Sequence, residues 1–500
     1  MKKHASSRHL VTVVAFALLV AVVSGGSPDV LAHQKGFVFT PLVFLGASTP
    51  GGEQFLETFD SSRINNRGDV QFSSLATGGE GREFLLRKGK ITELPIRAGA
   101  PAPDGAVFGP GSLSPTTLNN WGEAGLVVVL EPFQFPPDGP SFGMNAGVYR
   151  FRPNIRKIVS VMTPGVTPAP GGGMFAGAGF GANLNDRGDL VFAGIVPTDK
   201  GFPLPDDENG LGVGIFKANR KGHLSSLVSP GDQAPGGGLF DFTNGPWIND
   251  RGDVAFMGHV AGEECRPATG LPPLEVLIAC LSNVYVRHGA TGKIVAIARA
   301  GDPAPGGGTY RQAWSPVINN KGHIAFLGDL TAWPDSRAVM GVFLRSGGKT
   351  IRVSGPGDEM PGGGKLVTAS NILGWQLHMN NADEIVFNAT LDTSTLSTDD
   401  GDPIPDTGLY VWSHGALRLV ARTGTVIPGV GTIAQLVMNV LRIGPPPVFV
   451  PNSGAHNNDR GQVVFGARLI EEDEQGEPRG VLLVATPSSP WSTPKAGYSK

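Results

Sequence analysis

The chain has little of what most recognisable functional sites are built from. Its ten histidines are scattered without the spacing of metal ligands, and only two cysteines occur in 500 residues. Neither a Gly-x-Ser-x-Gly turn nor a Cys/His pair stands out. The common nucleophilic and zinc-dependent active sites are therefore not indicated by motif.

Charge of one sign is also lacking. The formal net charge is −3, and no long basic stripe occurs, so nucleic acid is not an expected partner. After the N-terminus, no segment is long and apolar enough to span a bilayer. We therefore expect no membrane span once an N-terminal signal has been removed.

The N-terminus is typical of a secretory signal. A short basic region precedes an apolar stretch over 10–23, which is too short for a confident membrane span. Cleavage could follow Gly25 or Ala32, so we expect the signal within 1–32 and an exported product, extracellular or periplasmic. An uncleaved anchor is the alternative.

A repeated turn motif dominates the rest of the chain. Asn is followed three residues later by Gly and seven residues later by a large apolar residue, usually Phe. The spacings run from about 54 to 78 residues, and a regular period of this kind indicates a repeat architecture. The motif asparagines are Asn65, Asn119, Asn185, Asn249, Asn319, Asn380 and Asn458.

The motif has a turn mechanism. Asn at the first position and Gly at the fourth predict a type I turn followed by a left-handed Gly, with the Asn side chain bonding backbone two residues on. The sixth copy places Asp383 where Gly is expected, and Asp tolerates that conformation at some cost. The Phe position should be core. We expect this turn to be structural.

Four short strands per repeat predict a β-propeller blade. In the third repeat, strands are expected over 174–184, 189–195, 212–218 and 224–228. The last repeat lacks a fourth strand, and the strand over 37–45 has no partner of its own, so the N-terminal strand should complete the last blade. We predict an all-β, seven-bladed propeller closed in this way. The expected blades are 51–103, 104–170, 171–235, 236–305, 306–361, 362–428 and 429–486 with 37–47.

The blades form one expected domain over 37–486, followed by a disordered tail over 487–500. Gly-triplet loops and long insertions are predicted on the face opposite the Asn turns, where function usually resides. Loop aromatics could stack on sugar rings, although such residues more often pack a loop onto its own blade. These candidates are Phe133, Phe135, Phe202 and Trp333.

Two further loop sites are candidates. Cys265 and Cys280 are expected to form a disulfide across the fourth-blade insertion, with two free thiols as the alternative. An acidic loop in the sixth blade could bind calcium, the one cofactor considered, or could be a solvated loop. Its carboxylates are Asp399, Asp400, Asp402 and Asp406.

The first strands should line a central channel, where paired carboxylates could do acid–base chemistry. A solvated channel lining is the alternative. The polar residues expected there are Glu57, Asp60, Asp241, Arg311 and Gln376.

The recurring N-x-x-G-x-x-x-F spacing resembles the bacterial exported tandem-repeat proteins named for that motif, also called choice-of-anchor proteins. The resemblance covers about 37–486. It implies export and a repeat fold but no reaction. Relatives often end in a sorting anchor, and the C-terminal tail here lacks the apolar segment of one, so release from the cell is expected.

Two function classes remain open. One is a secreted, non-enzymatic binding or scaffolding propeller, expected as a monomer, with a carbohydrate or protein ligand at the insertion-rich face. The other is an extracellular glycan hydrolase or lyase with its site at the channel mouth. Carboxylates clustered with His or Arg at that mouth would favour the enzyme.

Overall fold

A computed structural model describes most of the chain beyond the N-terminal segment. The described residues are 36–56, 60–112, 117–132, 145–202, 211–263, 283–330, 339–369, 377–397, 403–436, 454–472, 476 and 478–488. Every regular element in these ranges is a β-strand. Within them, no helix is long and apolar enough to cross a lipid bilayer. The expected signal and most of the expected tail lie outside these ranges.

The strands of the first half form three groups. The first sheet contains β2 (Asp60–Ile64), β3 (Val70–Ala76), β4 (Glu80–Arg87) and β5 (Lys90–Glu93). The second contains β6 (Phe108–Ser112), β7 (Thr117–Leu118), β8 (Ala124–Leu130), β9 (Ala146–Arg152) and β10 (Lys157–Met162). An eight-stranded sheet then contains β11 (Gly177–Leu184), β12 (Leu190–Phe202), β13 (Leu211–Ala218), β14 (Leu224–Val228), β15 (Phe240–Ile248), β16 (Val254–Val260), β17 (Asn283–Arg287) and β18 (Ile294–Ala298).

The second half continues the pattern. One sheet contains β19 (Gln312–Ile318), β20 (Ile324–Asp329), β21 (Met340–Ser346) and β22 (Lys349–Ser354). The next contains β23 (Leu366–Thr368), β24 (Leu377–Met379), β25 (Ile385–Leu391), β28 (Thr407–Ser413) and β29 (Ala416–Arg422), beside the small pair β26 (Leu396–Ser397) and β27 (Pro403–Ile404). The last contains β1 (Phe37–Phe44), β30 (Val426–Ile427), β31 (Gly431–Leu436), β32 (His456–Asn457), β33 (Val463–Glu472) and β34 (Pro478–Pro487).

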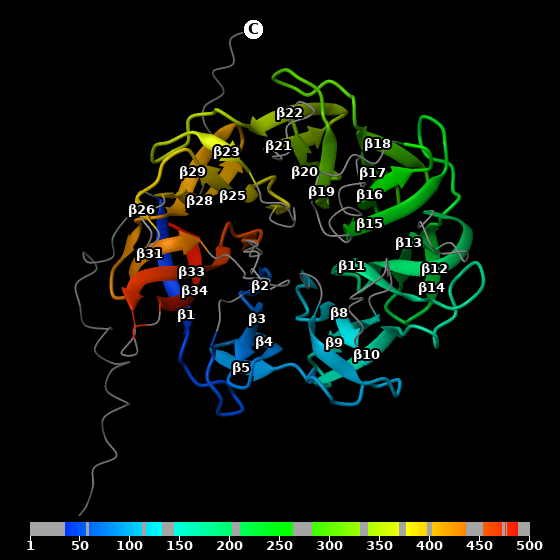
Figure 1. Ribbon diagram of the computed structural model, residues 1–500, viewed down its shortest axis with the longest axis horizontal. Helices are drawn as coiled ribbons and strands as arrows, with labels where there is room; N and C mark the ends of the chain where they lie inside the picture. The colour runs from blue at the N-terminus through cyan, green and yellow to red at the C-terminus, as the bar shows by residue number, and fades with distance from the viewer. Residues whose placement is uncertain are drawn as a thin grey trace, which may run out of the picture.

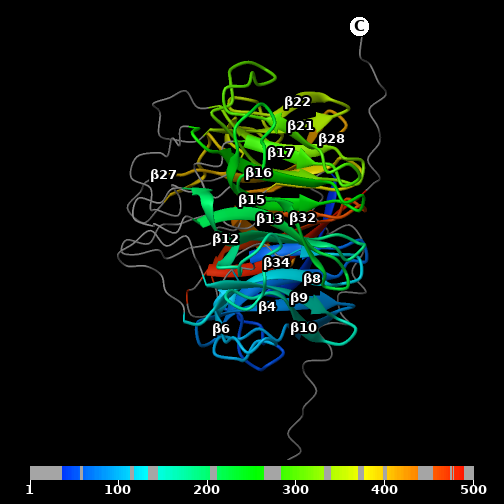
Figure 2. The same ribbon diagram turned by 90° about the vertical axis from the view of Figure 1, so that its right-hand side faces the viewer.

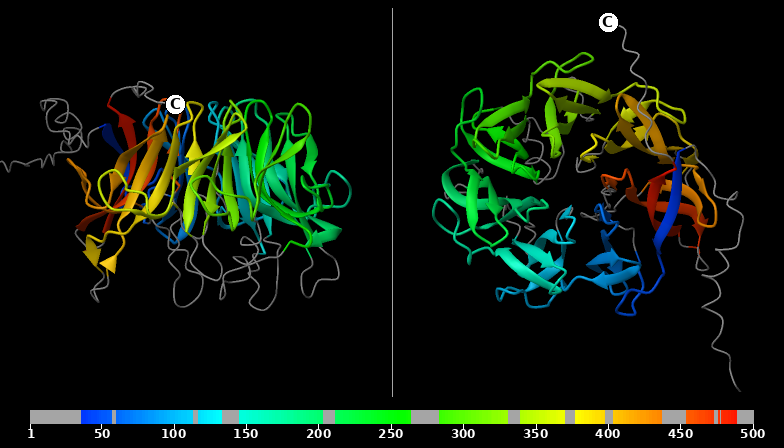
Figure 3. Two further views of the ribbon diagram at one scale, coloured as in Figure 1. Left: turned by 90° about the horizontal axis from the view of Figure 1, so that it is seen from above. Right: turned by 180° about the vertical axis from the view of Figure 1, so that it is seen from behind.

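These sheets stand around a central axis in a propeller-like ring (Figure 1). From the side the ring is a disc, and the strands run between its two faces (Figures 2 and 3). In the described residues, the pairing separates six sheets of four or more strands. Two repeats merge into the eight-stranded sheet because β13 and β15 share one parallel pairing, Val213 with Phe242. The predicted all-β, propeller-like arrangement is confirmed.

The Asn turns form as the sequence predicts. The Oδ1 atom of Asn185 accepts the backbone N–H of Arg187 at 3.1 Å and that of Asp189 at 2.9 Å. Gly188 follows with a φ of 80°, in the left-handed region that favours glycine. At the sixth copy Asp383 adopts a φ of 66°. Its carboxylate accepts hydrogen bonds from Asn319 and Lys321 of the neighbouring turn, which compensates the backbone strain.

The apolar position seven residues after each Asn is buried in every repeat, which confirms its core role. In five repeats the ring stacks on an aromatic residue of the third strand, as Phe192 does on Phe216 at 5.9 Å. The buried residues of the set are Phe72, Leu126, Phe192, Phe256, Phe326, Phe387 and Phe465.

The N-terminal strand completes the last sheet, as predicted. β1 pairs antiparallel with β34, from Phe37 opposite Pro487 to Phe44 opposite Val481. In Figure 1 the blue β1 lies beside the red β33 and β34, so the two ends of the described chain meet in one sheet. The buried Phe37 and Phe39 pack in the same core cluster as residues of β33 and β34.

Candidate functional site

The Asn turns are linked into a closed circuit around the axis. The Nδ2 atom of Asn65 donates to the carbonyl oxygen of Asn119 at 3.0 Å, and each motif Asn repeats this bond to the next. The circuit closes when Asn458 donates to the carbonyl oxygen of Asn65 at 3.0 Å. The five intervening bonds start from Asn119, Asn185, Asn249, Asn319 and Asn380. The motif thus carries contacts between repeats as well as its own turn.

A second circuit uses the residue after each motif Asn, which is always Asn or Asp. Its side-chain oxygen accepts the backbone N–H of the equivalent residue in the preceding repeat, as Asp186 accepts Asn120 at 2.7 Å. Burial raises the pKa of Asp186, and hydrogen bonds from Asn120 oppose that shift. The members are Asn66, Asn120, Asp186, Asp250, Asn320, Asn381 and Asp459.

The position two residues before each motif Asn faces the axial channel. These side chains come from the first strand of each repeat. Their residue types differ in nearly every repeat, whereas the positions of the two circuits are always Asn, or Asn and Asp. The channel-facing side chains line two adjoining cavities, and Asn183, Trp247 and His378 belong to both. The set is Arg63, Thr117, Asn183, Trp247, Val317, His378 and His456.

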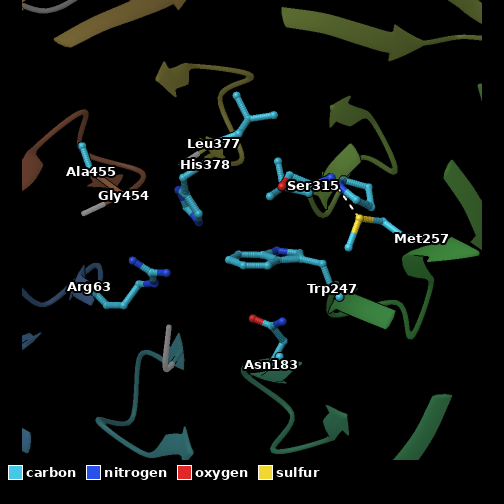
Figure 4. Close-up of a pocket in the computed structure, with 13 residues that line it drawn as sticks. Arg63, Asn183, Trp247, Met257, Ser315, Leu377, His378, Gly454 and Ala455 are labelled. Carbon is cyan, nitrogen blue, oxygen red and sulfur yellow. Dashed lines mark hydrogen bonds between the residues drawn. The ribbon is translucent and has the colours of Figure 1, made fainter. Parts of the chain in front are cut away.

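The inner cavity, which we call the axial pocket, encloses about 540 Å³ of empty space, open solvent included. Figure 4 shows four side chains converging on its middle from four repeats: Arg63, Asn183, Trp247 and His378. The lining contains no carboxylate among the described residues.

Backbone irregularities aim these side chains. The pairing of first and second strands shifts register just before the channel position, between Asn244 and Trp247 and between Trp314 and Val317. At the shift the chain takes positive φ values, 58° at Gly245 and 46° at Ser315. A β-bulge reorients the side chain that follows it, and a non-glycine residue at positive φ is strained.

Arg63 is a buried cation at this level, with 4% of its surface exposed. Its Nη1 atom donates to the Ser62 carbonyl oxygen at 2.9 Å, and its Nε atom has no hydrogen-bond partner within the ranges that the structure describes. Burial lowers the pKa of Arg63 to about 10, and the charge of Glu83 opposes the shift. Arg63 therefore stays protonated at neutral pH.

Two imidazoles in close contact, with their planes tilted by 31°, lie beside it. The ring centroids of His378 and His456 are 3.4 Å apart, and His378 Nδ1 is 2.7 Å from Asn457 Oδ1. Burial lowers the pKa of His378 to about 3 and that of His456 well below its usual value. Both rings are neutral at neutral pH.

Trp247 and Asn183 complete the pocket. The indole of Trp247 meets the His378 ring edge-on at 5.3 Å. Asn183 donates through Nδ2 to the Pro246 carbonyl oxygen, and its Oδ1 atom is buried without a hydrogen-bond partner. The pocket therefore offers an aromatic surface, one unsatisfied donor and one unsatisfied acceptor.

Most residues named from the sequence as ligand-binding lie outside the described ranges. This applies to Phe133, Phe135, Trp333, Asp399, Asp400 and Asp402, and also to Cys265 and Cys280, so the predicted disulfide stays a prediction. Phe202 ends β12, and its side chain is outside the described set.

Asp406 is described, and protein groups occupy its carboxylate. It accepts from Thr393 Oγ1 at 2.8 Å and Thr395 Oγ1 at 2.7 Å, and pairs with Arg422 at 3.0 Å. Burial alone would raise the pKa of Asp406, but these hydrogen bonds outweigh burial and lower it. Among the described residues, no group of three or more His, Cys, Asp or Glu could hold a metal ion.

The channel lining differs from the residues expected. Asp241 is buried against His259 at 2.8 Å, and Arg311 pairs with Asp329 at 2.6 Å, so neither lines the axial pocket. Both pairs join first and second strands at the ends remote from the Asn turns. Glu57 and Gln376 lie outside the described ranges, and only the backbone of Asp60 is described. Asp241 and Arg311 stand at or just before the start of their repeats' first strands and pair with residues of the second strand, so their side chains are used inside the blade.

The chain was compared with known proteins. A model of a family of unknown function, DUF7453, matches residues 17–271 and 279–488. The chain belongs to the DUF7453 family. This family model does not show membership of the N-x-x-G-x-x-x-F proteins, so the resemblance to them rests on the repeated motif alone. The comparison with curated proteins finds no match for this DUF7453 protein.

Solved structures similar to the DUF7453 chain include two polysaccharide lyases and a lectin. An ulvan lyase of family PL25 has a TM-score of 0.38 at 12% identity, covering 72% of this chain and 82% of its own. Polysaccharide lyase Uly1 has 0.41 at 10%, covering 86% and 90%. The SapL1 lectin, in complex with a methyl fucoside, has 0.28 at 11%, covering 87% and 97%. At these values we draw nothing from them about the ligand or reaction of the chain.

Proposed function

We propose that this chain is a binding protein, a seven-bladed β-propeller that holds a small carbohydrate in its axial pocket. One observation carries the proposal. In the axial pocket the Trp247 indole lies among polar groups, and two of these, Arg63 Nε and Asn183 Oδ1, are buried without a partner among the described residues. Unsatisfied buried polar atoms are costly, and a bound ligand supplies the missing partners.

The two hydrogen-bonded circuits support the blade count. Each has seven members and returns to its starting residue, as Asn458 bonds to Asn65 and Asp459 to Asn66. The eight-stranded sheet then counts as two blades joined by one parallel pairing. On this count β1 is the outer strand of the seventh blade.

The pocket chemistry favours binding over catalysis. A glycan hydrolase or lyase needs a general acid or base with a pKa near the working pH. The described lining of the axial pocket has no carboxylate, and burial holds the pKa of His378 at about 3. The adjoining cavity does contain three carboxylates, but each accepts hydrogen bonds from a neighbouring turn: Asp186, Asp250 and Asp459. An aromatic surface surrounded by a few polar groups is the usual make-up of a small-molecule site.

We also propose export, as the N-terminal basic and apolar segments suggest, and a monomeric state. Fractionation of cells producing the full-length chain, with N-terminal sequencing of the product, tests export and the cleavage site together. Recovery of the uncleaved chain in the cytoplasm would contradict it.

The binding proposal is tested by a thermal-shift screen of the mature chain against neutral and acidic sugars. A ligand at 100 times its dissociation constant stabilises by about 2.7 kcal/mol. We expect a shift in the unchanged chain and in the Trp121→Ala control, whose tryptophan lies exposed outside the pocket. The shift should vanish in Trp247→Ala. Equal shifts in all three proteins would place the sugar elsewhere and contradict the proposal.

A further inference from the structure

In the part of the chain that the structure describes, the buried positive charge of Arg63 in the axial pocket has no negative partner. Among the described residues, no carboxylate lies within ion-pair distance of Arg63, whereas the buried Arg311 and Arg422 are paired with Asp329 and Asp406. Glu83, whose charge acts on Arg63, is hydrogen-bonded to Gln71 Nε2 at 2.6 Å and Ser73 Oγ at 2.8 Å. A buried charge without a counterion is strongly unfavourable, so an anion from outside has a clear site here.

We propose that the ligand of the axial pocket is a sugar acid, whose carboxylate pairs with Arg63. This inference rests on the proposed function, because it names the class of sugar that the same pocket takes.

The free part of the guanidinium fits a carboxylate. Nη1 donates to the Ser62 carbonyl oxygen, and Nε is buried without a partner among the described residues, so a ligand that pairs with the Nε–Nη2 edge has to displace the side chains that cover Nε. Two parallel N–H groups on one edge of a guanidinium match the two oxygens of a carboxylate, and this bidentate pairing is stronger than neutral hydrogen bonds. A neutral hydroxyl would leave the charge of Arg63 uncompensated.

The remaining groups of the pocket fit the body of a sugar acid. Asn183 Oδ1 needs a donor, which a ring hydroxyl provides. Trp247 lies between Asn183 and His378, where its indole can contact the apolar face of a pyranose (Figure 4). His378 and His456 are neutral, so neither competes with Arg63 for the anion.

The charges at the Asn-turn mouth are arranged in two layers. Three carboxylates of the second circuit line the cavity between the Asn turns and the axial pocket, and each accepts hydrogen bonds from a neighbouring turn: Asp186, Asp250 and Asp459. Two residues after each motif Asn, five repeats place an exposed cation around them: Arg67, Arg187, Arg251, Lys321 and Arg460. Two of these cations are paired with carboxylates of the turns, Arg251 with Asp253 and Lys321 with Asp383. The channel face therefore carries charges of both signs, and the attraction for a sugar acid has to come from Arg63 itself.

The test is calorimetric titration of the mature chain with matched pairs of sugars. The probes are D-galacturonate against D-galactose and D-glucuronate against D-glucose, with acetate as a bare carboxylate. We expect at least one acid to bind about tenfold or more tightly than its neutral partner, because one charge-assisted bidentate pair separates them. Acetate should bind more weakly than that acid.

Variants separate a ligand role of Arg63 from a structural one. Arg63→Gln should lose the preference for the acid, and Arg63→Lys should retain part of it because the charge remains without the fork. The control is Arg97→Gln, an exposed arginine paired with Glu93 on an outer strand connection, which should bind as the unchanged chain does. Without ligand, Arg63→Gln should melt no lower than the unchanged chain, since it removes a buried unpaired charge. A lower melting temperature with unchanged sugar preference would show Arg63 to be structural and overturn the inference.

The other outcomes are distinguishable. Equal affinity for acidic and neutral sugars, with loss of both in Trp247→Ala, would overturn the inference and leave the proposed function standing. Acetate binding as tightly as the acids would overturn the sugar part of the inference. Absence of binding by every sugar tested would contradict the proposed function, and the inference would fall with it.

Discussion

The Nδ2 atom of Asn458 lies 3.0 Å from the carbonyl oxygen of Asn65, 393 residues away in the chain. It is the last of the seven bonds that run from one motif Asn to the next around the axis. Because the two residues belong to the last and first turns, this single bond joins the ends of the repeat array. The Asn motif therefore explains both the local turn and the closed ring.

The ring bond should contribute stability beyond that of the turn. Asn219 makes the same turn, with Oδ1 accepting from Lys221 and His223 at 2.9 and 3.0 Å, but no bond to another turn. Asn458→Ala should therefore destabilise the chain by about 0.5–1.5 kcal/mol more than Asn219→Ala, because it also removes a buried hydrogen bond to the Asn65 carbonyl oxygen, which keeps only the bond from Gly68 N–H. Urea unfolding of both variants measures the difference, and equal losses would show the circuit to be energetically neutral.

Removing the N-terminal strand should open the last sheet. Deletion of 36–45 exposes the edge of β34 and removes the buried Phe37, Phe39 and Val43. Since each buried Phe contributes about 3 kcal/mol or more, we expect a broad, early thermal transition and aggregation through the freed edge. A synthetic peptide of the deleted residues should restore the melting temperature in part. A cooperative transition at the original temperature would contradict closure by β1.

Stability should fall on acidification because of the histidine pair. The pKa of His378 is about 3 in the folded chain and about 6.5 when unfolded, so the unfolded chain binds a proton first. Above pH 6.5 His378 is neutral in both states and costs no stability. As the pH falls from 6.5 toward 3, the unfolded chain takes up a proton that the folded chain does not, so the free energy of unfolding decreases progressively. His378→Gln, which has no titrating group there, should flatten the stability profile in this window. Parallel profiles for both proteins, measured by denaturant unfolding, would show that His378 does not control it.

Asp406 should act as a structural anchor. It is fully buried. Its carboxylate forms an ion pair with Arg422 and accepts hydrogen bonds from Thr393 and Thr395. Asp406→Ala leaves the mostly buried Arg422 without its partner, and we expect a loss of about 1–3 kcal/mol. The matched measurement is the melting temperature of the unchanged chain with calcium and with chelator, which should be equal. A calcium-dependent rise that is absent in Asp406→Ala would instead support the calcium site predicted from the sequence.

The sequence predicts the fold well because the motif carries its own mechanism. The Asn-to-Gly spacing specifies a turn, the Phe position specifies the core, and the unpartnered strand at 37–45 specifies closure. These are local or pairwise relations that recur in every repeat. Asp383 was also recognised from the sequence as a turn residue, and its φ of 66° bears this out.

The axial pocket was not found from the sequence, for a definable reason. Its residues stand two positions before each motif Asn, and bulges at Gly245 and Ser315 turn the following side chains into the channel. The sequence analysis named other polar residues of the first strands, among them Asp241 and Arg311. Aligning the repeats on their Asn would have shown one variable column containing Arg63, Trp247 and His378. The burial and missing partner of Arg63, however, depend on side chains from several repeats.

The most direct test of the account is a crystal structure of the mature chain grown with the sugar acid that binds best. We predict a sugar ring against Trp247, with its carboxylate within hydrogen-bond distance of Arg63 Nε and a hydroxyl beside Asn183 Oδ1. Sugar bound only on the insertion-rich face, with water alone beside Arg63, would contradict the axial pocket as the binding site.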